Sequence, residues 1–435
     1  MKRFRPLLFW GHLAAGVLGA VVILVMSFTG ALLALKPQIQ KWVDRDVRSV
    51  VPLGSPRLGA YGLLTSVHHA RPDASIQSLA FDADPTVAAT VSLGREGNVY
   101  VNPYTGVVIG VASVRTSEFF QSMTSWHRYM GATGESRATG RAATGVSNLA
   151  FLLLGLSGLY LWWPRALTVR HLKPIVWFRG TSTARARDFN WHNTIGFWSL
   201  PAIIVMTLSG AVMSYQWGNN LVYRLTGSPL PPGRVAPGGP DGVENRAGRG
   251  GEQAAGREGG PEARQRRPEG TGPGPAAVIP AALDLLVARA EQQVPTWSQL
   301  SLRLPGRDGA PVPFTITDGA QWNQFARSQL TLNSASGEIV NWQPYDAQSL
   351  GQKMRGWLRF THTGELGGLA GQIVAGLGCM GGVFLVYTGL SLAVRRLWSW
   401  SLWARLGRRQ RARVAPPISN AVPASASNPF HESEA

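Results

Sequence analysis

The chain has 435 residues, 45% of them hydrophobic and 15% charged, with a formal net charge of +18. Its single cysteine excludes a disulfide framework, a cysteine-based zinc site and a C-x-x-C-H motif for covalent haem attachment. The positive charge does not indicate nucleic-acid binding, because arginine and lysine concentrate beside long apolar runs. Four of these runs reach the roughly 20 residues that a membrane span needs. The composition therefore predicts a multi-pass α-helical membrane protein surrounded by lipid.

The charges beside the predicted spans indicate a topology. Basic residues precede the first span, fill the short loop at 165–188, and follow the fourth span in a tail at 395–435 that is partly disordered. Cytoplasmic segments carry the excess of lysine and arginine, so we expect both termini and this loop in the cytoplasm of a bacterial inner membrane. The spans are predicted at 1–36, 145–164, 189–217 and 366–394.

Two long loops are expected outside the cytoplasm, and each contains a small α+β module. In the first module, at 37–120, a hairpin turns at Gly106, and in the second, at 276–347, a similar hairpin turns at Gly337. Glycine is favoured at these turns because they need a positive φ. The stretch 227–275, crowded with Gly, Pro, Arg and Glu, cannot bury a core and is predicted to be disordered.

The chain contains an internal repeat, which two shifts of the sequence reveal. The first shift, which places His12 on His192, lays the first span on the third without a gap. The second shift, which places Gly106 on Gly337, aligns the two hairpins and the ends of the second and fourth spans. We therefore predict a tandem duplication in which each external module lies between two spans. The matched residues are His12 with His192, Gly16 with Gly196, Met26 with Met206, Gly30 with Gly210, Ala31 with Ala211, Asn102 with Asn333, Gly106 with Gly337, Gly158 with Gly389, and Arg165 with Arg396.

Four histidines occupy corresponding places in this repeat. His12 and His192 lie near the cytoplasmic ends of the first and third spans, whereas His127 and His362 precede the second and fourth spans on the external side. Neutral imidazole commonly ligates haem iron, so we predict one non-covalent haem b for each pair. Alternatively, the inner histidines donate to carbonyls of neighbouring helices and the outer ones lie on amphipathic surface helices. His127 falls in a predicted interfacial helix at 121–144, and His362 falls in a predicted interfacial segment at 348–365.

Residues near the histidines extend the predicted sites. Gly16, Gly196 and Gly131 each follow a histidine by four positions, where a missing side chain leaves room for a porphyrin ring. Arginines near the outer pair are predicted to bind haem propionates and, together with two tryptophans, an external substrate. Met26 and Met206 are expected to pack in the core. The arginines and tryptophans are Trp126, Arg128, Arg355, Trp357 and Arg359.

No nucleotide site is predicted within the chain. The segment 376–381 matches G-x-G-x-x-G, but it lies inside an apolar run, without a preceding strand or an acidic residue about 20 positions later. Close packing of helices through small residues explains this segment better. The electron donor is therefore expected to be a separate cytoplasmic donor or a lipid quinol.

The order of span, module and span, present twice, resembles the PepSY-associated transmembrane family. So do the motifs Trp10-Gly-His-Leu-Ala-Ala-Gly and Ser27-Phe-Thr-Gly. The chain looks in particular like the di-haem, inner-membrane ferric-siderophore reductases of that family. This resemblance implies PepSY-like external modules and two haems per chain, held by the four histidines. It also implies an oxidoreductase that reduces ferric siderophores from Fe(III) to Fe(II) on the periplasmic side, which releases the iron.

Two other functions stay open at this point. The external modules could bind a peptide or a protease, which would make the chain a membrane regulator without redox activity. A haem protein of the same design could also reduce another periplasmic acceptor, such as copper or an oxidoreductase. A b-type haem spectrum distinguishes the first alternative from a redox function.

Overall fold

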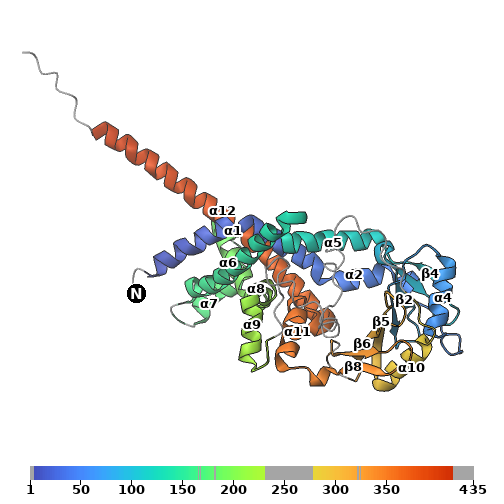
Figure 1. The fold of residues 1–435 in the computed structure, drawn as a ribbon. Coiled ribbons are helices and arrows are strands. Elements are labelled where there is room, and N and C mark those ends of the chain that lie inside the picture. Colours follow the sequence, from blue (N-terminus) through green and yellow to red (C-terminus); the bar gives the residue numbers. More distant parts are fainter. Residues whose placement is uncertain are drawn as a thin grey trace, which may run out of the picture.

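The computed structural model describes residues 4–164, 166, 168–180, 183–230, 278–320, 323 and 325–414. Most of the predicted insert at 227–275 and the tail beyond 414 lie outside the described residues. The described chain forms a bundle of long helices and, beyond one end of the bundle, a β-sheet domain with two helices on its far side (Figure 1).

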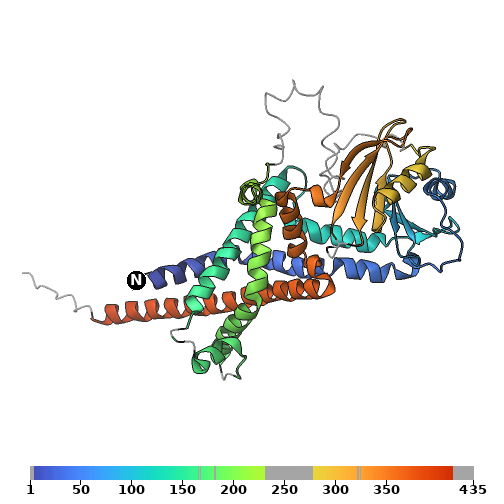
Figure 2. The same cartoon turned by 90° about the horizontal axis from the view of Figure 1, so that it is seen from below.

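Four helices are long and apolar enough to cross a membrane: α1 (Phe4–Ala34), α6 (Arg137–Trp162), α8 (Ala184–Ser214) and α12 (Gly368–Val414). Both α1 and α8 pack against α6 and α12, so the four form one bundle (Figure 2). Large apolar side chains face outward, among them Leu18, which is 85% exposed. An outer surface of this kind suits contact with lipid.

The ends of the spans differ from the predicted ends where local caps or turns intervene. α6 begins before the predicted position 145, because a short 3-10 turn, η2 (Gly134–Ser136), leads directly into it. α8 begins before the predicted position 189, because the Thr183 hydroxyl caps it by accepting a hydrogen bond from the Ala186 N–H. The connecting elements are α2 (Lys36–Val43), α3 (Arg45–Arg48), α7 (Val169–Val176), α9 (Gln216–Leu225), η1 (Gly94–Glu96), η3 (Tyr345–Ala347) and η4 (Glu365–Gly367).

Two further helices, α5 (Val114–Tyr129) and α11 (Leu350–His362), lie at the sheet end of the bundle and carry the outer histidines. The prediction of one continuous interfacial segment at 121–144 is wrong. α5 ends at Tyr129 because Met130 and Gly131 adopt positive φ angles of 54° and 74°, which interrupt the helix. Gly131 therefore lies in a turn and not on the helix of His127.

The strands of the two external segments form one eight-stranded antiparallel sheet, where the sequence predicted two modules. Each segment supplies four strands, and β1 pairs with β5 so that Leu79 lies opposite Leu302. This pairing satisfies the backbone groups of an edge that each four-stranded unit would otherwise leave open. The order is β4-β3-β2-β1-β5-β6-β7-β8. The strands are β1 (Ser78–Asp82), β2 (Ala89–Ser92), β3 (Asn98–Val101), β4 (Val108–Val111), β5 (Trp297–Arg303), β6 (Val312–Asp318), β7 (Arg327–Leu332) and β8 (Ile339–Gln343).

Two helices, α4 (Ala60–Ala70) and α10 (Leu283–Gln293), cover the face of the sheet that points away from the bundle (Figure 1). Strand residues alternate between the two faces, so Phe314 and Ile316 enter the core while Thr315 between them lies on the opposite face. The core contains residues from both segments. The two segments therefore fold as one domain, and the glycines predicted at the hairpin turns have the expected positive φ.

Replacing Leu302 with alanine should destabilise both halves of this domain. Leu302 is 1% exposed and packs in the shared core at the junction of β1 and β5. Truncation of a buried leucine costs about 2–5 kcal/mol. Limited proteolysis of the purified protein should therefore cleave both external segments faster. Ile339→Ala, at a residue that is 42% exposed, serves as the control. Faster cleavage of the second segment alone would show that the halves unfold independently.

The glycine-rich segment of α12 packs against α8, as the sequence predicted. A Cβ added at Gly378 would lie 2.6 Å from the Cβ of Ala202, and one added at Gly381 would lie 2.5 Å from the Cβ of Ser199. The small residues thus allow two membrane-length helices to approach closely. This contact explains the G-x-G-x-x-G pattern without a nucleotide.

Candidate functional site

The outer histidines meet between α5 and α11. The ring centroids of His127 and His362 lie 6.3 Å apart, with 65° between the ring planes. Nδ1 of His127 lies 2.9 Å from the carbonyl oxygen of Met26, and Nδ1 of His362 lies 2.9 Å from that of Met206. A carbonyl only accepts hydrogen bonds, so each Nδ1 carries the proton and each Nε2 keeps its lone pair for a ligand.

A hydroxyl adds to each of these contacts. Thr29 Oγ1 lies 3.0 Å from Nδ1 of His127, and Ser209 Oγ lies 3.1 Å from Nδ1 of His362. Both hydroxyls donate their own protons to the carbonyl four residues earlier in the helix, at 2.6 Å in each case. Each hydroxyl therefore accepts from the imidazole, which supports the same tautomer.

The inner histidines have matching partners on the other two spans. Nδ1 of His12 lies 2.8 Å from Ser157 Oγ of α6, and Nδ1 of His192 lies 2.9 Å from Thr388 Oγ1 of α12. Both hydroxyls donate to carbonyls of their own helices and so accept from the rings.

The four hydroxyls follow the sequence repeat, although the sequence-based prediction did not include them. The first shift of the repeat places Thr29 on Ser209, and the second shift places Ser157 on Thr388. Polar residues inside apolar spans indicate function. The two shifts align the spans that contain these residues. A search of the aligned spans for matching serines and threonines would therefore have revealed the four hydroxyl partners.

Glycines near the inner pair are of two kinds. A Cβ added at Gly158 or at Gly389 would lie 3.5 or 3.4 Å from the Cε1 atom of an inner histidine. The predicted Gly16 and Gly196 face leucines of α6 and α12 instead, at 3.8 and 3.6 Å. Gly158 and Gly389, which lie next to the inner rings, match one another in the sequence repeat. The sequence-based prediction did not assign them to the site.

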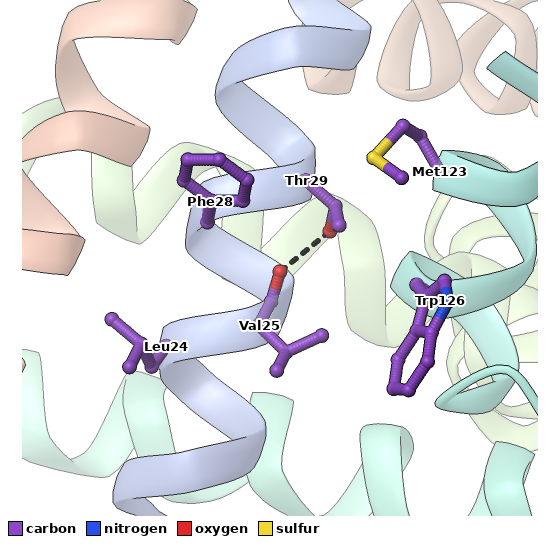
Figure 3. A pocket seen from close by; sticks show the side chains of 6 residues that line it. All are labelled: Leu24, Val25, Phe28, Thr29, Met123 and Trp126. Atoms are coloured by element: carbon purple, nitrogen blue, oxygen red, sulfur yellow. Dashed lines mark hydrogen bonds between the residues drawn. The ribbon is translucent and has the colours of Figure 1, made fainter. Parts of the chain in front are cut away.

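Trp126 lines an apolar groove. The groove has a volume of about 410 Å³ and lies between α1 and α5, where Figure 3 shows the Trp126 indole beside Met123. Gly131 turns the chain next to this indole, and a Cβ there would lie 3.0 Å from the ring. The lining residues are Leu24, Val25, Phe28, Thr29, Met123 and Trp126.

Basic residues gather around Glu365 at the sheet end of the bundle. The carboxylate of Glu365 acts on the charges of Lys36, Arg327 and Arg359, and Arg128 acts on Arg359. Burial lowers the pKa of each of these three cations, and Glu365 opposes that effect. Arg128 and Arg359 were predicted, whereas Lys36 and Arg327 come from elements distant in sequence. We call these five residues the outer charged cluster.

The other two predicted substrate residues are Arg355 and Trp357 of α11. The charge of Arg355 acts on Tyr223 of α9. The indole N–H of Trp357 donates to the Tyr345 hydroxyl at 3.1 Å, which ties α11 to η3. The Trp357 hydrogen bond holds α11 in place, so this residue positions the helix that carries His362.

The face of the sheet opposite α4 and α10 carries polar side chains. One cross-strand row runs over all eight strands, and Arg327 of the outer charged cluster lies on the same face, paired with Thr317. Thr315 and Gln329 are hydrogen bonded in this row at 3.1 Å. Within this row, Thr90, Ser301, Thr315, Gln329 and Gln343 offer uncharged donors and acceptors, whereas Tyr100 is buried and bonded to Asp44. The row is Gly110, Tyr100, Thr90, Ala80, Ser301, Thr315, Gln329 and Gln343.

The separation and the protonation of the outer pair are compatible with the binding of one haem iron. Two imidazoles that bind one iron from opposite sides at about 2 Å place their ring centres about 6 Å apart, close to the observed separation. Burial, and then the charge of His362, lowers the pKa of His127 to about 4, and burial lowers the pKa of His362. Both rings are therefore neutral at pH 7, which is the form that binds metal.

The described residues contain no cluster of three or more histidine, cysteine or carboxylate side chains able to hold a metal ion. The candidate sites are pairs, and a pair of imidazoles suits a metal that brings its own equatorial ligands, as haem iron does. The sulfur of Met206 packs 3.7 Å from Sγ of Cys379, and the contact of Met206 with the histidine is through its carbonyl.

These features define a polytopic membrane protein with histidine pairs in its helical bundle and a β-sheet domain beyond one end. The chain belongs to the PepSY-associated TM region family, whose model matches residues 9–396. A comparison with curated proteins finds no match.

Proposed function

We propose that this protein is a di-haem b electron-transfer protein of the bacterial inner membrane that reduces ferric siderophores on the periplasmic side. The observation that carries the proposal is the common environment of the four histidines. Each Nδ1 is bonded to a serine or threonine hydroxyl, which leaves each Nε2 available for a metal. One-electron transfer is the chemistry that haem supplies when bound.

The positions of the two pairs support transfer across a membrane. Fourteen residues separate His12 from Met26, whose carbonyl accepts from His127. The same spacing separates His192 from Met206. At 1.5 Å per residue the inner and outer sites lie about 20 Å apart along the helices. His12 and His192 would hold the haem at the inner side, and His127 and His362 the haem at the side of the sheet.

We also infer that the chain is a tandem duplication. The contacts repeat with the sequence, because the hydroxyl partners match at both shifts of the repeat and each half supplies four strands to the sheet. The basic residues at the ends of the spans opposite the sheet support cytoplasmic termini and a periplasmic sheet.

The surface around the outer pair supports a ferric chelate as the acceptor. The outer charged cluster has four cations and one carboxylate, which suits an anionic ligand. The polar row of the sheet adds uncharged hydrogen-bonding groups suited to the oxygen-rich body of a siderophore. Reduction to Fe(II) weakens binding by hard oxygen ligands, so the iron is released while the chelator stays intact. The electrons would come from a cytoplasmic donor or a quinol.

The hydroxyl that orients an imidazole should affect haem affinity. Thr388→Val removes the hydroxyl that accepts from Nδ1 of His192 and keeps the shape of the side chain, while the backbone of Leu385 remains as a weaker second partner. Loss of such a partner commonly lowers metal affinity about 10- to 100-fold. When the purified variant is diluted, it should lose the haem of the inner pair more readily than the parent protein does, and it should keep the other haem. Thr124→Val is the matched control, because its hydroxyl donates to the carbonyl of Phe120. Equal retention in both variants would contradict the assigned role.

Two measurements test the proposal in order. First, the pyridine haemochromogen of purified protein should give two haems per chain, and colourless protein would instead favour a regulator without redox activity. Second, the dithionite-reduced protein should be mixed anaerobically with ferric siderophores in a stopped-flow instrument, with ferrozine to trap Fe(II). Reoxidation coupled to Fe(II) release is expected. If the reduced haems are instead reoxidised by copper or by a periplasmic oxidoreductase and by none of several chemically diverse ferric siderophores, that result would identify another acceptor.

A further inference from the structure

A buried carboxylate joins α8 to α12 at the end of the bundle opposite the sheet. The side chain of Asp188 is 1% exposed and lies within a membrane-length helix. It accepts hydrogen bonds from Ser391 at 2.6 Å and Arg187 at 2.9 Å, and Arg395 lies 3.3 Å away. A buried charge in a membrane span is costly unless it is paired. The pairing therefore fixes both arginines in place.

The two arginines keep an outward-facing side. Each side chain is 43% exposed, whereas the carboxylate between them is not. Two positive charges and one negative charge leave one net positive charge at this point. A guanidinium has five N–H donors, and the contacts with Asp188 and Ser391 use two on each arginine. Both side chains can therefore bind an anion from outside without breaking the pairing.

An apolar groove leads from Arg395 along the surface of α12. It has a volume of about 470 Å³, and its polar end is formed by Ser391 and Arg395. From Arg395 to Tyr387 the helix rises about 12 Å within the candidate membrane span. Such a length suits part of an acyl chain that lies against the helix. The remaining lining residues are Tyr387, Leu390, Val394 and Trp398.

We propose that this groove is a binding site for an anionic phospholipid. The phosphate diester binds between Arg187 and Arg395, and one acyl chain lies along the groove of α12. The net positive charge of the cluster favours a headgroup without its own ammonium group, because a zwitterionic lipid brings a second cation to the same place. Trp398, beyond Arg395, lies where interfacial tryptophans are expected. The site adjoins the inner pair, since Asp188 and Ser391 lie about one turn from His192 and Thr388.

The test uses the full chain, extracted from nanodiscs of equal parts phosphatidylglycerol and phosphatidylcholine and analysed by native mass spectrometry. We expect phosphatidylglycerol to be retained at least tenfold over phosphatidylcholine. Arg395→Gln should abolish this preference, and Arg187 still partners Asp188 in that variant. Leu390→Trp, which fills the groove and leaves the ion pairs intact, should reduce retention of both lipids.

Arg396→Gln is the matched control, because the Arg396 guanidinium lies over the rings of Phe9 and Trp10, away from Asp188. This variant should retain phosphatidylglycerol like the parent protein. Equal retention of both lipids by the parent would overturn the proposal. So would an unchanged preference in Arg395→Gln, unchanged lipid retention in Leu390→Trp, or displacement of the lipid by a soluble quinone analogue.

Discussion

His127→Ala and His362→Ala should each reduce the haem content from two to one per chain, and both should remove the same haem. The reason is that their rings lie 6.3 Å apart, with Nδ1 of each directed to a backbone carbonyl. Loss of either ligand leaves the iron with one imidazole. Pyridine haemochromogen analysis gives the stoichiometry, and low-temperature spectra identify the haem that remains.

The control for these variants is His171→Ala, because His171 is exposed and hydrogen bonded to Thr168 outside the bundle. That protein should keep both haems. If His127→Ala and His362→Ala lose different haems, the two histidines do not share an iron. Retention of two haems by either variant would also show that the two histidines do not share an iron.

The second large effect concerns the inner pair. His12→Ala and His192→Ala should lower the rate of Fe(II) formation at least 100-fold when electrons are supplied from the cytoplasmic side of proteoliposomes. The outer pair is intact in both variants, so dithionite added on the outside should still reduce the remaining haem. This contrast separates a break in transfer across the membrane from general loss of structure.

Normal Fe(II) formation in an inner-pair variant that lacks one haem would show that the donor reaches the outer site directly. An exposed histidine of α4, His69, provides a further control, since His69→Ala should leave both rates unchanged. A comparable fall in that variant would indicate a nonspecific effect of the substitution.

The spans and the pairing of the outer histidines could be predicted because each rests on a local or periodic signal. Apolar runs of membrane length identify helices without any tertiary information. The repeat shifts compare segments that fold alike, so they also contained the hydroxyl partners and the glycines beside the inner rings. The hydroxyls Thr29, Ser157, Ser209 and Thr388 needed only the additional step of searching the spans for polar matches.

Other features depend on tertiary packing and had no local signal. The direction of the Trp126 side chain depends on how α5 rotates against α1, which the sequence of α5 alone does not specify. The end of that helix depends on Met130, a non-glycine residue with φ of 54°, where sequence patterns would place glycine. Arg327 joins the outer charged cluster only because the start of β7 lies near Glu365 of η4 in the fold.

The shared sheet has a consequence for biosynthesis. Its central strands come from opposite halves of the chain, and Asp82 and Gln299, which are hydrogen bonded, lie 217 positions apart. During translation the first four strands are synthesised long before β5. The edge of β1 therefore stays unpaired while α6 and α8 are inserted into the membrane. The external domain can close only after the third helix has crossed. Insertion of the first three spans therefore precedes completion of the sheet, and the β1–β5 pairing joins two segments of the chain that are synthesised far apart.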